Sequence, residues 1–445
     1  MKICFIPIDN RPVCYNLAKD ICAIDESIEL FIPPREYLGD LVKSADIDYL
    51  FEWLENMPPV DKMILSLDTL AYGGLIPSRR CLESFDEIKS RIERLKPLLE
   101  GKKVYAFSSI MRISNNNYNE EEKEYWKDYG KEIFRVSYEI DKNGFCKEIN
   151  IPPEIFDDYR VTRKRNFEIN KIYLKWQKKG LFDTLIFSKD DCAEFGYNVA
   201  EARDLEKMGG KTKTGADEIP LTLLARAIEK DIKIYPLFIE PEYKDSISNY
   251  EDISIEKSVL GQLELGGFKI VNSEDEADII LVVNNFIEQQ GELVMDWVTK
   301  SFNKTFVPPK KPYAIADVRF ANGADNKFVE ELFKNSLENL PQYGYSGWNT
   351  SANTLGSLIA GVKAKFKANK YNDAAYKKLQ LIRFLDDWAY QANVRKKIDA
   401  PCDIKKFMKP YEDILIQKLS LSDKHFDIEY LFPWNRKFEV EIKAE

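Results

Sequence analysis

Histidine is almost absent from this chain: of its 445 residues, only one is a histidine. That residue, His425, lies near the C-terminus in a segment rich in Lys and Asp. Ser-His-Asp and Cys-His catalytic arrangements need an imidazole beside the nucleophile, so both classes are excluded. Zinc sites built mainly from histidine are excluded for the same reason. Any acid–base chemistry must therefore use carboxylates, Lys, Tyr or Cys.

Paired cysteines, long apolar runs and basic patches are also absent. The seven cysteines are scattered without a CxxC pattern, which is typical of reduced thiols in a cytoplasmic protein. Cys192 follows an Asp pair, but no histidine is available to activate it, so we interpret it as a small buried residue. No window has the length of a membrane span, and the apolar run after Met1 is too short for a signal peptide. Charges of both signs are interspersed around a net charge of −9. We therefore expect a cytoplasmic protein with no membrane and no nucleic-acid partner.

Short apolar segments alternate with helical patterns along the first 350 residues, which predicts an α/β fold with parallel strands. A TIM-barrel-like arrangement and a Rossmann-like parallel β/α arrangement both fit this alternation, and we favour a barrel-like first part. Nine or ten candidate strands are more than the eight of a plain barrel. Two facing Rossmann-like halves, split near Asp231, are therefore the alternative.

The length exceeds what one simple core usually needs. The pattern predicts an α/β catalytic part at residues 1–230 with a helical insertion at 115–180. A second α/β part follows at 231–350, and a C-terminal helical region occupies 351–445. Within that last region, Phe438–Ile442 is a candidate closing edge strand. Oligomeric state is not predicted.

The most informative stretch is the apolar run Thr184–Phe187, which reads as a buried strand and leads into Lys189, Asp190 and Asp191. Adjacent carboxylates repel each other, and one of the two is expected to titrate abnormally. An acid–base or nucleophile pair requires this behaviour. We therefore assign Asp190 and Asp191 as candidate catalytic residues. The alternative is a solvated loop that caps the helix beginning near Val199.

Polar side chains also follow the other predicted strands. In a barrel and in a doubly wound sheet alike, the carboxyl ends of parallel strands converge, so we expect these side chains in one region. Asp9 and Arg11 are as well explained by a structural ion pair as by a contact with substrate. The glycines at 73–74 match neither a GxGxxG nor a P-loop pattern. The candidate substrate-binding residues are Asp9, Arg11, Asp68, Tyr72, Arg112, Lys189, Asp317, Arg319, Trp348 and Asn349.

Seven segments span nearly the whole chain: PIDNRPVCYN, LSLDTLAYGGLIPSR, SKDD, GADEIPLTLLARA, DVRFANGAD, GWNTSANTLG and LFPWNRKFEV. Together they resemble a bacterial family catalogued as domain of unknown function 4127 (DUF4127). The family has no settled biochemical function, so the resemblance implies no mechanism. The first segment departs from the PLDDRP common in the family, because Asn10 replaces an acidic residue, which weakens any catalytic role there.

A second resemblance covers only Asp190, Asp191 and, loosely, Trp348–Asn349. An Asp pair after a strand is similar to the O-GlcNAcase/hyaluronidase-type glycoside hydrolases. That similarity implies substrate-assisted cleavage of an N-acetylhexosamine, with one Asp orienting the acetamido group and the other acting as acid.

Three functions remain open. Carboxylates, amides and a Trp face suit a sugar, which favours a carbohydrate-active hydrolase acting on a small-molecule or oligosaccharide substrate without metal or other cofactor. Strand-end Asp and Asn with four arginines also suit a Mg²⁺-dependent enzyme for a phosphorylated or carboxylated small molecule. A non-catalytic sugar-binding protein is the third. The four arginines are Arg11, Arg79, Arg112 and Arg319.

Overall fold

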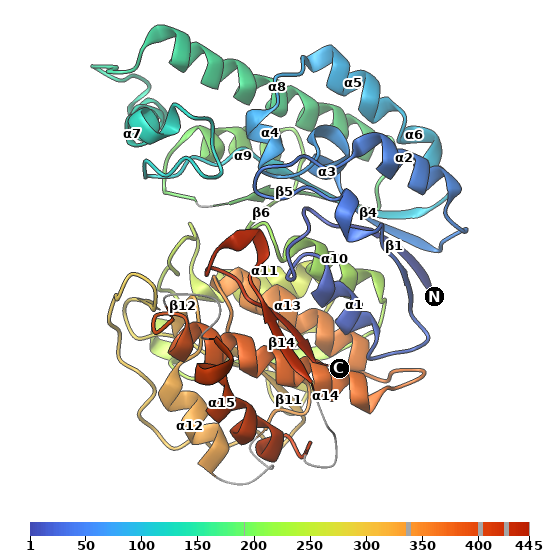
Figure 1. Cartoon of the computed structure of the whole chain (residues 1–445), viewed down its shortest axis with the longest axis vertical. Coiled ribbons are helices and arrows are strands. Elements are labelled where there is room, and N and C mark those ends of the chain that lie inside the picture. The colour runs from blue at the N-terminus through green and yellow to red at the C-terminus, as the bar shows by residue number, and fades with distance from the viewer. Residues whose placement is uncertain (191, 335–339, 399–403, 422–426, 445) are drawn as a thin grey trace. The chain divides into compact units, whose positions relative to one another are not determined.

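The structure is a computed structural model that describes residues 1–190, 192–334, 340–398, 404–421 and 427–444. Parallel strands alternate with helices, which confirms the α/β class (Figure 1). The chain divides into two compact units, and it passes between them more than once. Unit 1 comprises Met1–Tyr15, Glu29–Leu223 and Tyr250–Asp252, and unit 2 comprises Asn16–Ile28, Leu224–Asn249 and Ile253–Glu445.

Unit 1 is built on a six-stranded parallel sheet with the order β2-β1-β3-β4-β5-β6. Strands β3 and β5 are buried along their whole length, as expected of a parallel sheet that is covered on both faces. The apolar runs expected to be strands therefore form the centre of the unit. The strands are β1 (Lys2–Ile6), β2 (Glu29–Phe31), β3 (Lys62–Ser66), β4 (Lys103–Ile110), β5 (Thr184–Lys189) and β6 (Thr212–Thr214).

Helices surround this sheet, and α8 packs on β4 and β5 (Figure 1). Local signals explain several helix starts: the Asp46 side chain caps one helix, and Ser84 with Glu87 forms a capping box at another. The predicted insertion contains two long helices with a small core of their own around Trp126 and Tyr159. The helices are α2 (Ile47–Asn56), α3 (Leu67–Tyr72), α4 (Pro77–Arg80), α5 (Phe85–Glu93), α6 (Lys96–Leu99), α7 (Trp126–Asn143), α8 (Pro153–Lys178), α9 (Tyr197–Lys207) and α10 (Ile219–Ala227), the last of which continues into unit 2.

Unit 2 contains a five-stranded parallel sheet with the order β13-β11-β9-β7-β8. In each sheet, the strand that comes first in the sequence is paired on one side with the second strand and on the other side with the third. Both orders are open in the part of the chain described, so the barrel-like arrangement that we favoured is not found and the Rossmann-like one fits. The strands are β7 (Lys233–Phe238), β8 (Lys269–Ile270), β9 (Ile279–Asn284), β11 (Tyr313–Asp317) and β13 (Tyr345–Ser346), with a separate short pair β10 (Gly291–Glu292) and β12 (Phe320–Ala321).

The C-terminal part is mainly helical, but its predicted closing strand is placed wrongly. Strand β15 (Glu441–Ala444) pairs antiparallel with β14 (Ile428–Leu431) in a separate two-stranded sheet, so it does not extend the main sheet. None of the described helices is long and apolar enough to cross a membrane. The helices of unit 2 are α1 (Asn16–Cys22), α11 (Ile255–Leu265), α12 (Asn326–Lys334), α13 (Ser351–Lys365), α14 (Asp373–Arg383), a π-helix (Phe384–Val394) and α15 (Ile404–Lys418).

Candidate functional site

The carboxyl edge of the unit 1 sheet collects most of the polar side chains expected at a site. The strand order reverses between β1 and β3, and ligands of open α/β sheets bind at the carboxyl ends beside such a reversal. Asp9 follows β1, and Asp68 lies at the start of α3, directly after β3. The Thr69 hydroxyl donates hydrogen bonds to the Pro7 and Ile8 carbonyls, at 2.7 and 3.1 Å, which ties the two loops together.

Arg11 joins two carboxylates beside β1. Its Nε donates to Asp9 Oδ2 at 2.8 Å, and its Nη1 and Nη2 donate to Asp217 Oδ2 and Oδ1 at 3.0 and 2.6 Å. All three side chains are buried. Ligand atoms of Asp9, Cys14 and Asp217 lie within 4.8 Å of one another, but the guanidinium already supplies the positive charge there. The ion pair between Asp9 and Arg11 is therefore real, and it extends to Asp217.

Asp68 is a buried carboxyl whose charged form is disfavoured. Burial raises its pKa to about 7, against the opposing effects of hydrogen bonds from Ser109 and the charge of Arg79. The Ser109 amide donates to Oδ2 at 2.7 Å. The hydroxyls of Tyr72 and Tyr173 are buried without a hydrogen-bond partner among the described residues, and besides burial the Asp68 carboxyl raises both of their pKa values. At neutral pH this carboxyl is therefore partly protonated and able to give up a proton.

Glu218 is a further buried carboxyl at this edge. Burial raises its pKa well above the ordinary value, and the negative charges of Asp217, Glu251 and Asp190 raise it further. Gly215 before it has φ +104°, and a Cβ there would lie 1.7 Å from Glu218 Oε1. The glycine thus provides both the backbone conformation and the space that this carboxyl needs.

Asp190, one of the two predicted catalytic residues, is held by arginines. Its Oδ2 accepts from Arg112 Nη1 at 3.3 Å and lies 4.0 Å from Arg79 Nη2. Its side chain is 23% exposed, which leaves it accessible to a ligand. Helix α9 begins at Tyr197 after Gly196 without a side-chain cap, so Asp190 does not cap it and the capping alternative is wrong for this residue. Asp191 lies outside the described residues.

Lys189, expected to bind substrate, is engaged within unit 1. Its Nζ donates to Asp252 Oδ2 at 2.5 Å, and the Thr214 hydroxyl donates to Asp252 Oδ1 at 2.7 Å. This contact fixes the ends of β5 and β6 to the short segment Tyr250–Asp252.

Asp317 and Arg319, also predicted to bind substrate, belong to unit 2 and are fully buried there. Asp317 accepts hydrogen bonds from the Asn284 amide side chain, the Asp325 backbone amide and the Tyr345 hydroxyl. Burial, together with the charge of Asp325, raises the pKa of Asp317. This carboxyl thus has several protein partners.

Arg319 is equally well paired. It donates to Asn284 Oδ1 at 3.1 Å, to Glu240 Oε1 at 2.9 Å and to the Lys300 carbonyl at 3.0 Å. The two side chains therefore form part of a connected polar network at the carboxyl ends of β7, β9 and β11.

Trp348 and Asn349 follow β13, also in unit 2. Trp348 is buried. Asn349 has φ +60°, and its carbonyl accepts a hydrogen bond from the Asn322 amide. The residues predicted to share one region thus fall into a set at the unit 1 edge and a set at the unit 2 edge.

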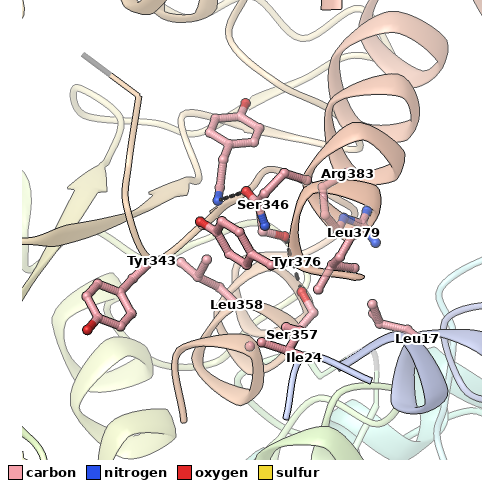
Figure 2. Close-up of a pocket in the computed structure, with 13 residues that line it drawn as sticks. Leu17, Ile24, Tyr343, Ser346, Ser357, Leu358, Tyr376, Leu379 and Arg383 are labelled. Atoms are coloured by element: carbon pink, nitrogen blue, oxygen red, sulfur yellow. Dashed lines mark hydrogen bonds between the residues drawn. The ribbon is translucent and has the colours of Figure 1, made fainter. Parts of the chain in front are cut away.

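A narrow cavity lies elsewhere in unit 2, between α1, β13, α13 and α14 (Figure 2). Its lining is mostly apolar and aromatic, with Tyr343 and Tyr376 among the larger side chains. The Ser346 and Ser357 hydroxyls are 3.2 Å apart. Arg383, which also lines it, is bound to Asp386 and Asp387. None of the predicted site residues lines this cavity.

Sequence reasoning missed three contributors to the unit 1 edge: Glu121, Glu122 and Asp252. The two glutamates lie in the strongly charged segment that is predicted as a helical insertion, yet Glu122 is only 5% exposed. Asp252 comes from a three-residue excursion of the chain into unit 1, and no local pattern signals such an excursion.

Comparisons with known proteins give a family but no activity. A family model described as Protein of unknown function (DUF4127) matches residues 3–443. No curated protein matches the chain. A solved structure of a UGT transferase from Siraitia grosvenorii in complex with UDP has 9% sequence identity and a TM-score of 0.21, covering 93% of this chain and 99% of that chain. A TM-score this low carries no argument about fold or function.

Proposed function

The chain belongs to the DUF4127 family, and we propose that it is a carbohydrate-active hydrolase whose site is the carboxyl edge of the unit 1 sheet. The single observation that carries this proposal is the contrast between two carboxyls at that edge. Asp68 is buried with a pKa raised to about 7, whereas Asp190 is partly exposed and bound by Arg112. Pairs of carboxyls in such different environments supply an acid and a base at the same pH.

Glycosidic cleavage needs these two roles. In the proposed mechanism Asp68 donates its proton to the leaving-group oxygen. Asp190, which Arg112 binds, attacks the anomeric carbon or activates a water that does so. Asp191 remains a candidate for orienting a 2-acetamido group, which makes an N-acetylhexosamine the first sugar to try. No metal is required for these steps.

The proposal is tested by screening aryl glycosides, including 2-acetamido sugars, and then comparing isosteric variants. We expect Asp68→Asn and Asp190→Asn each to lower kcat by about 100-fold or more, because each removes one of the two proton or electron-pair roles. The rate should fall as the pH rises through about 7, where Asp68 loses its proton. Asp191→Asn is assayed beside them.

Asp61→Asn is the matched control. Asp61 lies directly before β3, at the opposite end of the strand from Asp68, and is exposed. It should keep the activity of the parent protein. If an active substrate is found and the variants at 68, 190 and 191 all retain full activity, the site is assigned wrongly.

A metal-dependent enzyme acting on a phosphorylated or carboxylated molecule is the second candidate. It is favoured by the three convergent ligand atoms of Asp9, Cys14 and Asp217, since carboxylates attract hard cations. The placement of Arg11 between the two carboxylates weighs against it. Loss of activity on chelation, with recovery on adding Mg²⁺, would favour this candidate over the first.

A further inference from the structure

Two guanidinium groups at the unit 1 edge converge on one carboxylate oxygen. Glu122 Oε1 accepts from Arg79 Nη1 at 3.0 Å and from Arg112 Nε at 3.1 Å. Arg112 Nη2 also donates to Glu121 Oε2 at 2.8 Å. Both glutamates lie between β4 and α7, in a segment that forms neither helix nor strand. A carboxylate oxygen bound by two arginines occupies the position that an anionic ligand would take.

Arg79 has a hydrogen-bond donor that pairs with none of the described residues. Its side chain is 1% exposed, and its Nη2 atom is buried without a hydrogen-bond acceptor among the described residues. That atom is 4.0 Å from Asp190 Oδ2, the proposed catalytic carboxylate. Leaving a buried guanidinium donor unmet costs free energy, and a planar oxyanion placed between Arg79 and Arg112 would satisfy it.

The charges around the pair also permit an exchange. Two guanidiniums, Arg79 and Arg112, face three carboxylates, those of Asp190, Glu121 and Glu122. A monoanion that replaced the Glu122 carboxylate would leave this balance of charges unchanged. The exchange would therefore add no repulsion among the negative groups.

Glu122 has room to leave without unfolding its segment. It also lines an open hollow on the surface together with Leu82, Lys123 and Tyr125. Arg80 meanwhile donates to the backbone carbonyls of residues 119, 120 and 122. The backbone is thus held independently of the Glu122 carboxylate, which is able to turn toward the hollow.

From these observations we propose that the substrate carries an anionic group, a carboxylate or a phosphate, which Arg79 and Arg112 bind in place of Glu122. This inference rests on the proposed function, since it names the substrate class of the same site. It adds that the site binds a charged sugar and that Glu122 occupies the anion position when no ligand is bound.

The test measures binding of three sugars to the full chain by calorimetry: glucuronate, glucose 6-phosphate and neutral glucose. We expect at least one charged sugar to bind about tenfold more tightly than glucose, which corresponds to one charge-assisted contact. The charged sugar that binds more tightly identifies the anion. Arg112→Gln should abolish the preference for charge.

Glu122→Gln is the decisive variant, because it keeps the shape of the side chain and removes the competing charge. It should bind the preferred charged sugar several-fold more tightly. Glu120→Gln, an exposed neighbour in the same segment, is the matched control and should bind as the parent does. Melting curves confirm that each variant is folded.

Equal binding of all three sugars, no binding of any of them, or unchanged or weaker binding by folded Glu122→Gln would overturn the inference. These results are separable from the proposed function. Charge preference without hydrolysis of any glycoside would leave the anion site standing and reject the hydrolase. Hydrolysis of neutral glycosides without charge preference would reject the anion site and leave the hydrolase standing.

Discussion

At the scale of single residues, this protein places carboxyls of the same kind in very different environments. Asp68 is buried, accepts a hydrogen bond from the Ser109 amide and has a pKa raised to about 7. Asp217 is buried against a guanidinium, and Asp190 is partly exposed between two arginines. In general, burial and charge partners set how readily a carboxyl gives up its proton. Composition alone indicates that carboxylates must perform the chemistry, but not which of them is the acid.

Arg11 offers a residue-scale prediction. Replacing it by Met leaves Asp9 and Asp217 buried without their shared cation, so Arg11→Met should lower the free energy of unfolding by about 3–5 kcal/mol. Urea denaturation measures the change. Arg94→Met, which breaks the exposed pair with Asp48, should cost less than about 1 kcal/mol. Similar losses for the two variants would mean that Arg11 does not neutralise the buried carboxylates.

At the scale of elements, the sequence predicted the buried strands, which depend on apolar patterning. It missed the features of helices that depend on tertiary partners. Strands such as β3 and β5 were found because their apolar runs are fully buried. The π-helix Phe384–Val394 was read as ordinary helix, because its pattern is no different locally. Its Asp387 accepts from the Gly347 amide and pairs with Arg383, and such partners are visible only in the folded chain.

The loop between β6 and α10 offers an element-scale prediction. Gly215→Ala would place a Cβ 1.7 Å from Glu218 Oε1, so the Glu218 carboxyl must move. We expect loss of stability of about 2 kcal/mol or more from strain and displacement. Gly101→Ala is the control: its φ is +71°, but nothing lies within 4 Å of the added atom. It should cost only about 1 kcal/mol. Equal thermal shifts for both variants would show that Glu218 is not held against Gly215.

At the scale of the whole molecule, the chain builds two units whose sheets share the strand order 2-1-3-4-5. The α/β class and the Rossmann-like alternative followed from the alternation of elements. The division did not, because α1 belongs to unit 2 although it follows β1 of unit 1 in sequence. Contacts such as Arg11 with Asp217, 206 residues apart, have no signature in a single sequence.

Asp25 offers a prediction at this scale, since it ties three distant parts of unit 2 together. It accepts hydrogen bonds from Ser27, from the backbone amides of Asn369 and Lys370, and from Lys230 Nζ. Asp25→Ala should destabilise the protein by about 3 kcal/mol. Although burial opposes the shift, its hydrogen bonds lower the pKa of this carboxyl. Its contribution is therefore present above about pH 4 and declines as the pH falls further.

The comparison is between the unfolding free energies of Asp25→Ala and the parent at pH 7 and at pH 3. The difference between the two proteins should be smaller at the lower pH. An alanine variant as stable as the parent at pH 7 would mean that Asp25 does not join these segments.

The central claim is that Asp68, whose pKa is raised to about 7, lies at the same edge as Asp190, which Arg112 binds. The most direct test is a ¹³C NMR titration of the Asp side-chain carboxyls, with the Asp68 signal assigned by its loss in Asp68→Asn. The account predicts that this signal titrates near pH 7. Titration near pH 4, the ordinary range for Asp, would contradict it and remove the proposed acid.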